Sequence, residues 1–221
     1  MRLQEQGDKA IRCRNVWKFL FDIDGTLVDS SAVVVRVWRE VAAEFGADAE
    51  AILRSCHGRL DTDVVAEFFR PQARPAALRL VNELETAAID GVVAMDGAPE
   101  LLAGLPSADW AAVTSGPRPL MSGRLLAAGL PVPEVFITAE DVTAGKPDPQ
   151  GFLLAARGLG VPAANCVVIE DSPAGVAAGK AAGALVVAIT STHQAHALTA
   201  ADIVISGLPD LLPVLPAQAG R

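Results

Sequence analysis

Two carboxylates, Asp22 and Asp24, follow the apolar run Phe19–Phe21 and precede Gly25. Alternate residues of a strand point the same way, so both side chains are expected to leave a strand end on one face. Close carboxylates repel each other, and Mg²⁺, which prefers hard oxygen ligands, relieves that repulsion. Beside such an ion one carboxylate can act as a nucleophile and the other can transfer protons. A polar strand end and turn explains the same residues equally well, so this motif by itself leaves both interpretations open.

Two later segments offer groups that could hold a phosphate. Thr114 and Ser115 follow the apolar run Trp110–Val113, and hydroxyls beside the N–H groups that open a helix can bind an anion. Lys146 lies in a stiff loop between glycine and proline, from which an ammonium group can be aimed at a phosphate. An ordinary helix N-cap and a solvated loop lysine are the structural alternatives.

A second acid pair, Glu170 and Asp171, follows the apolar run Val167–Ile169. These residues could interact with the dipole of the helix that follows, or they could complete a cation site begun by Asp22 and Asp24. Four strand ends would then carry an acid pair, a hydroxyl, a lysine and another acid pair. Such a set can bind a metal and a phosphoryl group and attack the phosphorus.

From residue 96 onward, apolar strand-like runs alternate with alanine-rich helical stretches. This alternation predicts an α/β fold with a parallel sheet, in which ligands bind beyond the carboxyl ends of the strands. The candidate strands are Trp110–Val113, Val135–Ile137, Val167–Ile169, Leu185–Ile189 and Ile203–Ile205. The candidate helices between them are Leu120–Ala128, Gln150–Gly158 and Ala174–Ala182.

The segment between the first strand and this core has helical periodicity, and from Phe45 to about residue 94 it contains no convincing strand. Its candidate helices are Ala32–Phe45, Ala49–Cys56, Asp61–Phe69 and Ala76–Ala88. We therefore expect a loose N-terminal extension over residues 1–15, a catalytic core over 16–30 and 96–221, and a helical cap over 31–95.

Composition excludes several classes of protein. The 221 residues carry a net charge of −8 without a basic cluster, which argues against nucleic acid or an anionic membrane as a partner. Cys13, Cys56 and Cys166 are odd in number and widely spaced, as expected of reduced thiols in the cytoplasm. The first fifteen residues lack the apolar centre of a signal peptide, and no apolar stretch is long enough to span a bilayer. The predicted location is cytoplasmic, and the protein is expected to be a monomer or a weak homodimer.

In this order, the segments Asp22–Thr26, Thr114, Lys146 and Glu170–Asp171 resemble the four motifs of the haloacid dehalogenase-like hydrolase superfamily. The finer resemblance is to bacterial sugar phosphatases and to fungal deoxyglucose-phosphate and glycerol-phosphate phosphatases. The segments that carry it are Val113–Gly116, Glu134–Val142, Gly145–Pro147 and Glu170–Val176. The resemblance implies a Rossmann-like parallel sheet flanked by helices, with a small all-helical cap inserted after the first strand.

The resemblance also assigns roles. It implies that Asp22 is the nucleophile that forms an aspartyl-phosphate, and that Asp24 protonates the leaving alkoxide and later deprotonates water. Thr114 and Ser115 would hold phosphoryl oxygens, and Lys146 would neutralise charge between the phosphate and Asp22.

The same resemblance implies a Mg²⁺ site formed by Asp22, Asp171 and the backbone carbonyl of Asp24. Glu170 would support this ion directly or through water.

In the cap, the segment His57–Arg59 resembles a His-Gly-basic segment of these phosphatases. His57 and Arg59 are therefore the candidate substrate contacts, although a surface histidine and a solvated arginine are the alternatives. Glu83 and Glu85 could meet sugar hydroxyls, but a solvated helical face is the expected place for both.

The predicted function is Mg²⁺-dependent hydrolysis of small sugar or polyol phosphates. A phosphosugar mutase resembling β-phosphoglucomutase is the first alternative. Such mutases tend to carry histidine at the position of Val34, valine or isoleucine at that of Thr26, and arginine at that of Asp61. This chain differs at all three positions, so the hydrolase is favoured. A non-catalytic phosphosugar-binding protein is weaker because every catalytic acid is present. A haloacid dehalogenase would need neither Asp24 nor the carboxylates that bind magnesium, so this alternative is set aside.

Overall fold

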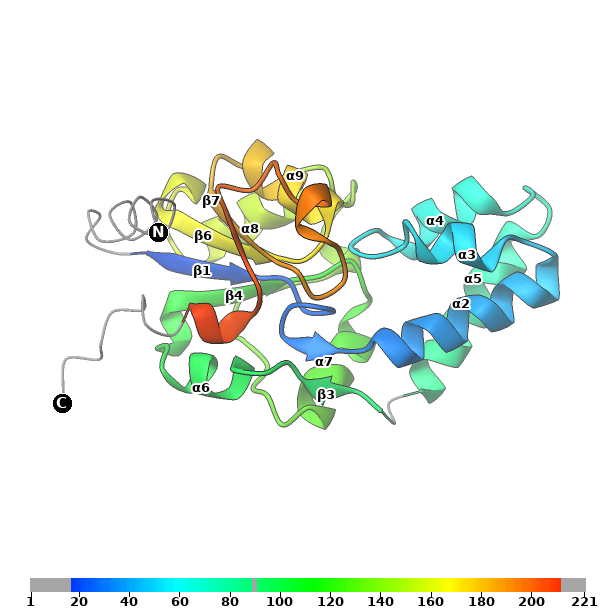
Figure 1. Ribbon diagram of the computed structural model, residues 1–221, viewed down its shortest axis with the longest axis horizontal. Coiled ribbons are helices and arrows are strands. Elements are labelled where there is room, and N and C mark those ends of the chain that lie inside the picture. The colour runs from blue at the N-terminus through cyan, green and yellow to red at the C-terminus, as the bar shows by residue number, and fades with distance from the viewer. Residues whose placement is uncertain (1–16, 89–90, 212–221) are drawn as a thin grey trace.

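The computed structural model describes residues 17–88 and 91–211, which form a sheet-based core and a helical lobe beside it (Figure 1). The core sheet has the strand order β5-β4-β1-β6-β7-β8, and every neighbouring pair in it is parallel. Its strands are β1 (Lys18–Phe21), β4 (Trp110–Val113), β5 (Phe136–Ile137), β6 (Cys166–Glu170), β7 (Leu185–Ile189) and β8 (Ile203–Ile205). The predicted α/β fold class is therefore confirmed.

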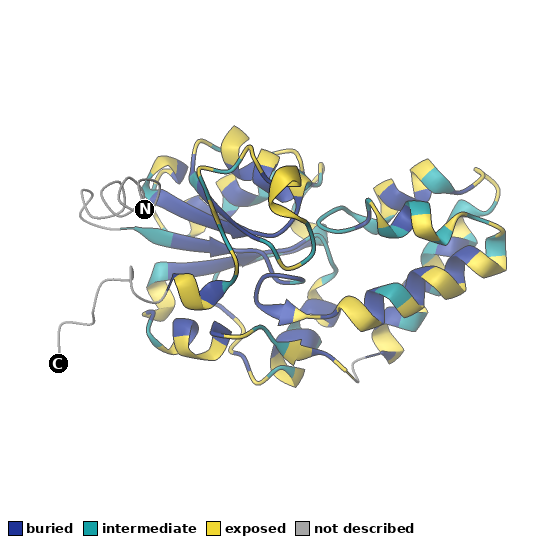
Figure 2. Cartoon of the chain, in the orientation of Figure 1, coloured by how far each residue is buried: buried dark blue, intermediate teal, exposed yellow. Residues whose placement is uncertain are grey.

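The central strands are apolar because helices cover both faces of the sheet, and they are dark blue in Figure 2. On one face, Leu20 of β1 packs in a cluster with Phe152 of α8 (Gln150–Gly158) and with α9 (Pro173–Ala181). On the other face, Phe21 lies in a cluster with residues of α6 (Ala98–Ala103) and α7 (Arg118–Ala127). The polar residues that follow these strands consequently emerge at one edge of a rigid layer.

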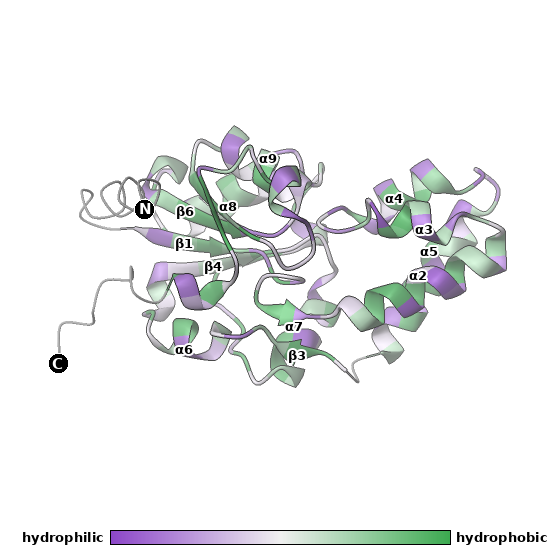
Figure 3. Cartoon of the chain, viewed as in Figure 1, coloured by the Kyte–Doolittle hydropathy of each residue, from purple (hydrophilic) through white to green (hydrophobic). Residues whose placement is uncertain are grey.

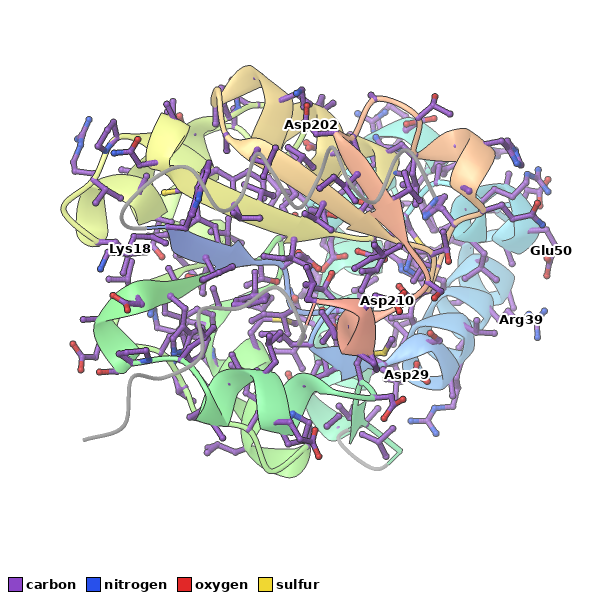
Figure 4. The ribbon with its side chains drawn as sticks, turned by 60° about the vertical axis from the view of Figure 1, so that its left-hand side comes forward. Lys18, Asp29, Arg39, Glu50, Asp202 and Asp210 are labelled. Carbon is purple, nitrogen blue, oxygen red and sulfur yellow. The ribbon has the colours of Figure 1, made fainter. Side chains whose placement is uncertain are left out.

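Four helices form the cap: α2 (Ser31–Phe45), α3 (Ala49–Leu53), α4 (Asp61–Phe68) and α5 (Arg74–Ala87). Hydrophobic and hydrophilic segments alternate along α2 in Figure 3, as in an amphipathic helix. Its apolar side buries Trp38, whose ring lies 6.5 Å from that of Phe69. On the outer surface, Arg39 and Glu50 form an exposed ion pair of 3.0 Å between α2 and α3 (Figure 4).

A short antiparallel pair joins the cap to the core. β2 (Val28–Asp29) pairs with β3 (Val93–Ala94), so the segments that lead into and out of the cap lie side by side. The expectation of no strand from Phe45 to about residue 94 was wrong for β3. Two-residue strands are too short to show a periodic pattern, and pairing across more than sixty residues is a tertiary event.

The sequence located most other elements within a few residues. Trp110–Val113, Leu185–Ile189, Ile203–Ile205 and Gln150–Gly158 have the predicted limits, whereas α3 ends at Leu53 and not at Cys56. Helix α6 was not predicted. The expected extension over residues 1–15 lies outside the described residues, and the proposed domain limits stay predictions. Within the described ranges, no helix combines the length and apolar character needed to cross a bilayer.

Candidate active site

Four charged side chains from three distant segments meet at the carboxyl edge of the sheet. Asp22 follows β1, and its backbone N–H continues the sheet by donating to the carbonyl of Ile169 over 3.0 Å. Lys146 Nζ contacts Asp22 Oδ1 and lies 2.6 Å from Glu170 Oε1. Carboxylate oxygens of Asp22, Glu170 and Asp171 all lie within 4.8 Å of one another. The predicted acid pairs and lysine are thus one buried cluster.

Glu170 is fixed by the start of α9. Its Oε2 accepts hydrogen bonds from the N–H groups of Asp171 and Ser172, both at 2.9 Å, and from the Ser172 hydroxyl at 3.0 Å. Gly175 permits this approach, because a Cβ there would lie 1.7 Å from Glu170 Oε1. With its other oxygen on Lys146, Glu170 anchors the lysine beneath Asp22.

The cluster carries more negative than positive charge. Burial raises the pKa of Asp22 well above its ordinary value, although Lys146 opposes the shift. Burial and the neighbouring Glu170 and Asp22 likewise raise the pKa of Asp171. Burial lowers the pKa of Lys146, but Asp22 and Glu170 outweigh it and hold the lysine protonated. Three buried carboxylates with one lysine are a hard-oxygen donor set that a divalent cation such as Mg²⁺ fits.

Two hydroxyls extend from the end of β4 beside this cluster. The N–H of Thr114 donates to the carbonyl of Ile137 over 2.9 Å, which continues the sheet, and Thr114 Oγ1 accepts from the N–H of Gly116 at 3.2 Å. Ser115 Oγ donates to the carbonyl oxygen of Gly58, in the cap, over 2.9 Å. Ser115 therefore joins the core to the cap in this structure.

Asp24 is held by a residue that the sequence analysis missed. Its Oδ1 accepts a hydrogen bond from Ser30 Oγ at 2.7 Å and an ion pair from Arg124 Nη1 at 2.8 Å. Arg124 also reaches the cap, because its Nη2 lies 3.2 Å from Glu85 Oε1. This guanidinium is 2% exposed. The guanidinium group of Arg124 therefore lies between Asp24 of the core and Glu85 of the cap.

The expectation for Glu85 was therefore wrong. Glu85 is buried at the inner side of α5, whereas Glu83 is exposed as expected. Burial raises the pKa of Glu85, and Arg124 opposes the rise. The signal for this pair was present in α7, where Arg124 follows Leu120 and Met121 at helical spacing and so falls on the apolar face. A charge on such a face needs a buried partner.

A cavity of about 60 Å³ lies between the core and the cap. Its lining includes both core acids of the first motif and both predicted cap residues. The residues that line it are Asp22, Asp24, Val34, Trp38, Cys56, His57, Gly58, Arg59, Asp61, Glu85, Thr114, Ser115, Gly116, Met121 and Arg124. This volume is smaller than the several hundred Å³ of typical small-molecule sites, so we expect the cap to move when a ligand enters.

The cap candidates occupy the rim of this cavity. Arg59 Nη2 pairs with Glu67 at 2.8 Å, so its charge is already partnered. The ring of His57 lies 6.0 Å from that of His193, which follows β7. Burial and the nearby His193 lower the pKa of His57, which favours the neutral imidazole. Both predicted residues line the cavity, but His57 is the one without an ion-pair partner among the described residues.

Comparison with known proteins agrees with this geometry. A family model described as haloacid dehalogenase-like hydrolase matches residues 19–183. Hexitol phosphatase A of Escherichia coli is 39% identical over 216 residues, which cover 91% of this chain and 94% of that protein. Glycerol-1-phosphate phosphohydrolase 2 of Saccharomyces cerevisiae is 35% identical over 187 residues, 79% of this chain and 75% of that protein.

The fold is also found among solved structures. A hydrolase from Pseudomonas syringae superposes with a TM-score of 0.82 at 27% identity, over 92% of this chain and all of that one. The family model covers most of the chain and includes the strand ends that carry Asp22, Thr114, Lys146 and Glu170. The chain therefore belongs to the haloacid dehalogenase-like hydrolase family, as its motifs predicted.

Proposed function

We propose that this protein is a Mg²⁺-dependent phosphatase that hydrolyses small sugar or polyol phosphates through an aspartyl-phosphate on Asp22. The observation that carries the proposal is the buried cluster in which Lys146 bridges Asp22 and Glu170 beside Asp171. An ammonium group and three carboxylates at one strand edge form a site for a cation and a phosphoryl group, and they leave Asp22 beside both.

In this proposal, Asp22, Asp171 and the backbone carbonyl of Asp24 would hold the ion, and the clustering of Asp22 and Asp171 with Glu170 supports it. Glu170, whose carboxylate oxygens both accept hydrogen bonds, would support the ion directly or through water. When bound, Mg²⁺ would supply positive charge to the phosphoryl oxygens and keep Asp22 ionised. Thr114 and Ser115 bind the remaining phosphoryl oxygens, with Ser115 exchanging its hydrogen bond to Gly58 for one to the substrate.

The reaction has two steps. In the first, the Asp22 carboxylate attacks phosphorus, the bond from phosphorus to the ester oxygen breaks, and Asp24 gives its proton to the departing alkoxide. In the second, Asp24 accepts a proton from the water that attacks the phosphorus of the aspartyl-phosphate, which releases inorganic phosphate and restores Asp22. Ser30 and Arg124 both bind Oδ1 of Asp24, so Oδ2 is free of these contacts for the transferred proton.

The relatives support the substrate class. They are named for a hexitol phosphate and for glycerol 1-phosphate, and both compounds are phosphate monoesters of uncharged polyols. The small volume of the cavity between core and cap favours a small substrate, which would enter as the cap moves. We also propose a cytoplasmic protein that acts as a monomer or weak homodimer, and the buried free thiols of Cys56 and Cys166 support that location.

A phosphosugar mutase remains the second candidate because it would share the core cluster. Val34 and Asp61, two of the positions at which the sequence departs from such mutases, both line the cavity. A glucose 1-phosphate assay separates the two functions, since a hydrolase releases phosphate and a mutase yields glucose 6-phosphate.

The test of the proposed function is a phosphate-release screen over sugar and polyol phosphates, with and without Mg²⁺. We expect turnover with Mg²⁺ and loss of turnover in EDTA. Asp22→Asn is the matched variant, because it keeps the shape of the side chain and removes the nucleophile. It should lower kcat by at least about a thousandfold without lowering the melting temperature. Wild-type rates in this variant would exclude Asp22 as the nucleophile.

A further inference from the structure

Among the described residues that line the cavity between core and cap, each arginine is already paired with an acid. The carboxyl groups that line the cavity belong to Asp22, Asp24, Asp61 and Glu85, and its guanidinium groups belong to Arg59 and Arg124. Arg124 is bound by Asp24 and Glu85 from two sides. Arg59 is bound by Glu67. Lys146 is not among the residues that line this cavity, and it pairs with Asp22 and Glu170 in the core.

Asp61 is the unusual member of this set. It is the first residue of α4, is half-buried and lines the cavity, yet its carboxyl group forms no hydrogen bond or ion pair with any other described residue. Burial and the nearby Glu85 raise its pKa to about 8, with Arg124 opposing and Asp24 adding to the shift. By contrast, Asp24 and Glu85 are ion-paired with Arg124, and Ser115 donates a hydrogen bond to Gly58. A half-buried carboxyl group that lines a cavity without a protein partner is available to a ligand.

The chemistry of that ligand follows from what a carboxyl can bind. A hydroxyl group donates to a carboxylate, and it can also accept from a protonated carboxyl, so an alcohol fits Asp61 in either state. When Asp61 is ionised, it would repel a phosphate or carboxylate group, and among the described lining residues no free cation offsets that repulsion. The same end of the cavity therefore suits hydroxyls and opposes a second anion.

We propose that Asp61 is a specificity-determining residue that restricts the enzyme to phosphate monoesters whose remote end carries uncharged hydroxyls. Compounds with a second phosphate or a carboxylate at that end are rejected. This inference rests on the proposed function, since it assumes that the substrate's phosphoryl group occupies the end of the cavity near Asp22 and Lys146.

Three substrates with the same six-carbon chain test it. Glucitol 6-phosphate, 6-phosphogluconate and glucitol 1,6-bisphosphate differ at carbon 1, which carries an alcohol, a carboxylate and a phosphate respectively. With the full-length protein and Mg²⁺, at a pH above the pKa of Asp61, kcat/KM for the alcohol should exceed that for either analogue with an anionic carbon 1 by about tenfold or more, the scale of a moderate like-charge repulsion.

Three variants locate the cause. Asp61→Asn should reduce this preference severalfold, and Asp61→Arg should reverse it by giving a second anion a partner. Asp63→Asn is the matched control, because Asp63 is an exposed acid in the same turn of α4 and should leave the preference unchanged. A preference that is equal in the wild type, Asp61→Asn and Asp61→Arg would overturn the inference, as would a wild type that prefers the anionic analogues.

Binding separates this inference from the proposed function. The dissociation constants of glucitol 6-phosphate and 6-phosphogluconate are measured by calorimetry with Asp22→Asn, alone and combined with Asp61→Asn. If no compound is hydrolysed but the binding preference is present and depends on Asp61, the proposed catalysis fails and the inference stands. If the compounds are hydrolysed without such a preference, the inference fails and the phosphatase stands. If neither ligand binds and none turns over, both fail.

Discussion

Asp24 illustrates how one carboxyl group is prepared by its neighbours. Ser30 and Arg124 both contact its Oδ1, and the side chain keeps 25% of its surface exposed toward the cavity side of the core. The contacts fix the orientation of the group, while its exposure lets it exchange a proton with a substrate or with water. A group so placed matters most for substrates whose leaving group needs a proton.

Asp24→Asn should therefore reduce turnover of alkyl phosphates by about 10²–10⁴-fold, the usual size of general acid–base catalysis. The loss should be much smaller in the first step with 4-nitrophenyl phosphate, whose leaving group departs without a proton. Stopped-flow kinetics on both substrates measures the difference, and Asp29→Asn, an exposed acid nearby, is the control. An equal loss with both substrates would contradict the acid role.

Asp61 makes stability depend on pH. Its pKa is 3.8 as an ordinary carboxyl and about 8 in the folded protein, because of burial and of Glu85, with Arg124 opposing and Asp24 adding. Between these values the folded state binds more protons than the unfolded state, so the stabilising contribution is complete below about pH 4 and is lost as the pH rises to about 8. The native state thus tolerates Asp61 best when it is protonated.

Asp61→Asn should remove this dependence. Its melting temperature should match that of the wild type near pH 4 and exceed it by several degrees near pH 8, since about 1 kcal/mol shifts a chain of this size by roughly 2–4 °C. Calorimetry of both proteins across this range measures the difference, and Asp63→Asn provides the reference for an exposed acid of α4. A constant difference at every pH would contradict the assignment.

At the scale of elements, the loop between α3 and α4 brings the cap onto the core. Gly58 gives its carbonyl to Ser115, and its own Cα lies so close to the core that a Cβ would be 2.2 Å from Ser172 Oγ. Ser172 cannot easily yield, because its side chain caps α9 and binds Glu170. Leu60 packs equally closely against Gly145, the residue before Lys146. Small residues at these contacts let the cap approach the cluster of Asp22, Lys146, Glu170 and Asp171.

Gly58→Ala should therefore hinder closure of the cap. We expect kcat/KM for a polyol phosphate to fall by about tenfold or more, because an incompletely closed site positions the substrate poorly. Gly46→Ala is the control, since Gly46 also has a positive φ, +68° against +76°, but has open space around its Cβ. Both variants should lose about 1 kcal/mol of stability from backbone strain, and Gly58→Ala alone should lose activity. Full activity in Gly58→Ala would show that the close contact between Gly58 and the core is not needed for turnover.

For the whole molecule, the excess of buried negative charge couples stability to cation binding. Asp22, Glu170 and Asp171 lie together with one lysine, so the folded state without a divalent ion contains unrelieved repulsion. An ion that binds the folded state and not the unfolded state stabilises it by about 1.4 kcal/mol for each tenfold excess over its dissociation constant. An ion in the proposed site would thus stabilise the sheet that positions these acids.

Addition of MgCl₂ should raise the melting temperature of the wild type by several degrees relative to KCl of equal ionic strength, and EDTA should reverse the rise. Asp171→Asn should lose this response. In EDTA the variant should be at least as stable as the wild type, because it removes one of the crowded charges. A wild type whose melting temperature ignores Mg²⁺ would argue against the proposed ion site.

The sequence by itself determined the parallel core and the residues at its strand ends. Runs such as Trp110–Val113 and Leu185–Ile189 are apolar on both faces, and the chain changes to polar residues where each run ends. Parallel strands align these ends at one edge, so the meeting of Asp22, Lys146 and Glu170 follows from local pattern together with a general rule of topology.

The tertiary structure alone decided what the cap contributes. Whether Glu85 faces water or Arg124, and whether Asp61 has a partner, depends on how α4 and α5 pack over α7, and no local pattern in the cap contains that information. The short β2–β3 pair could not be predicted from local sequence either, because the whole cap separates its two strands along the chain. A side chain at the end of a strand can be predicted from the apolar run that precedes it. A buried charge between the core and the cap cannot, because its partner comes from a segment that is distant in the sequence.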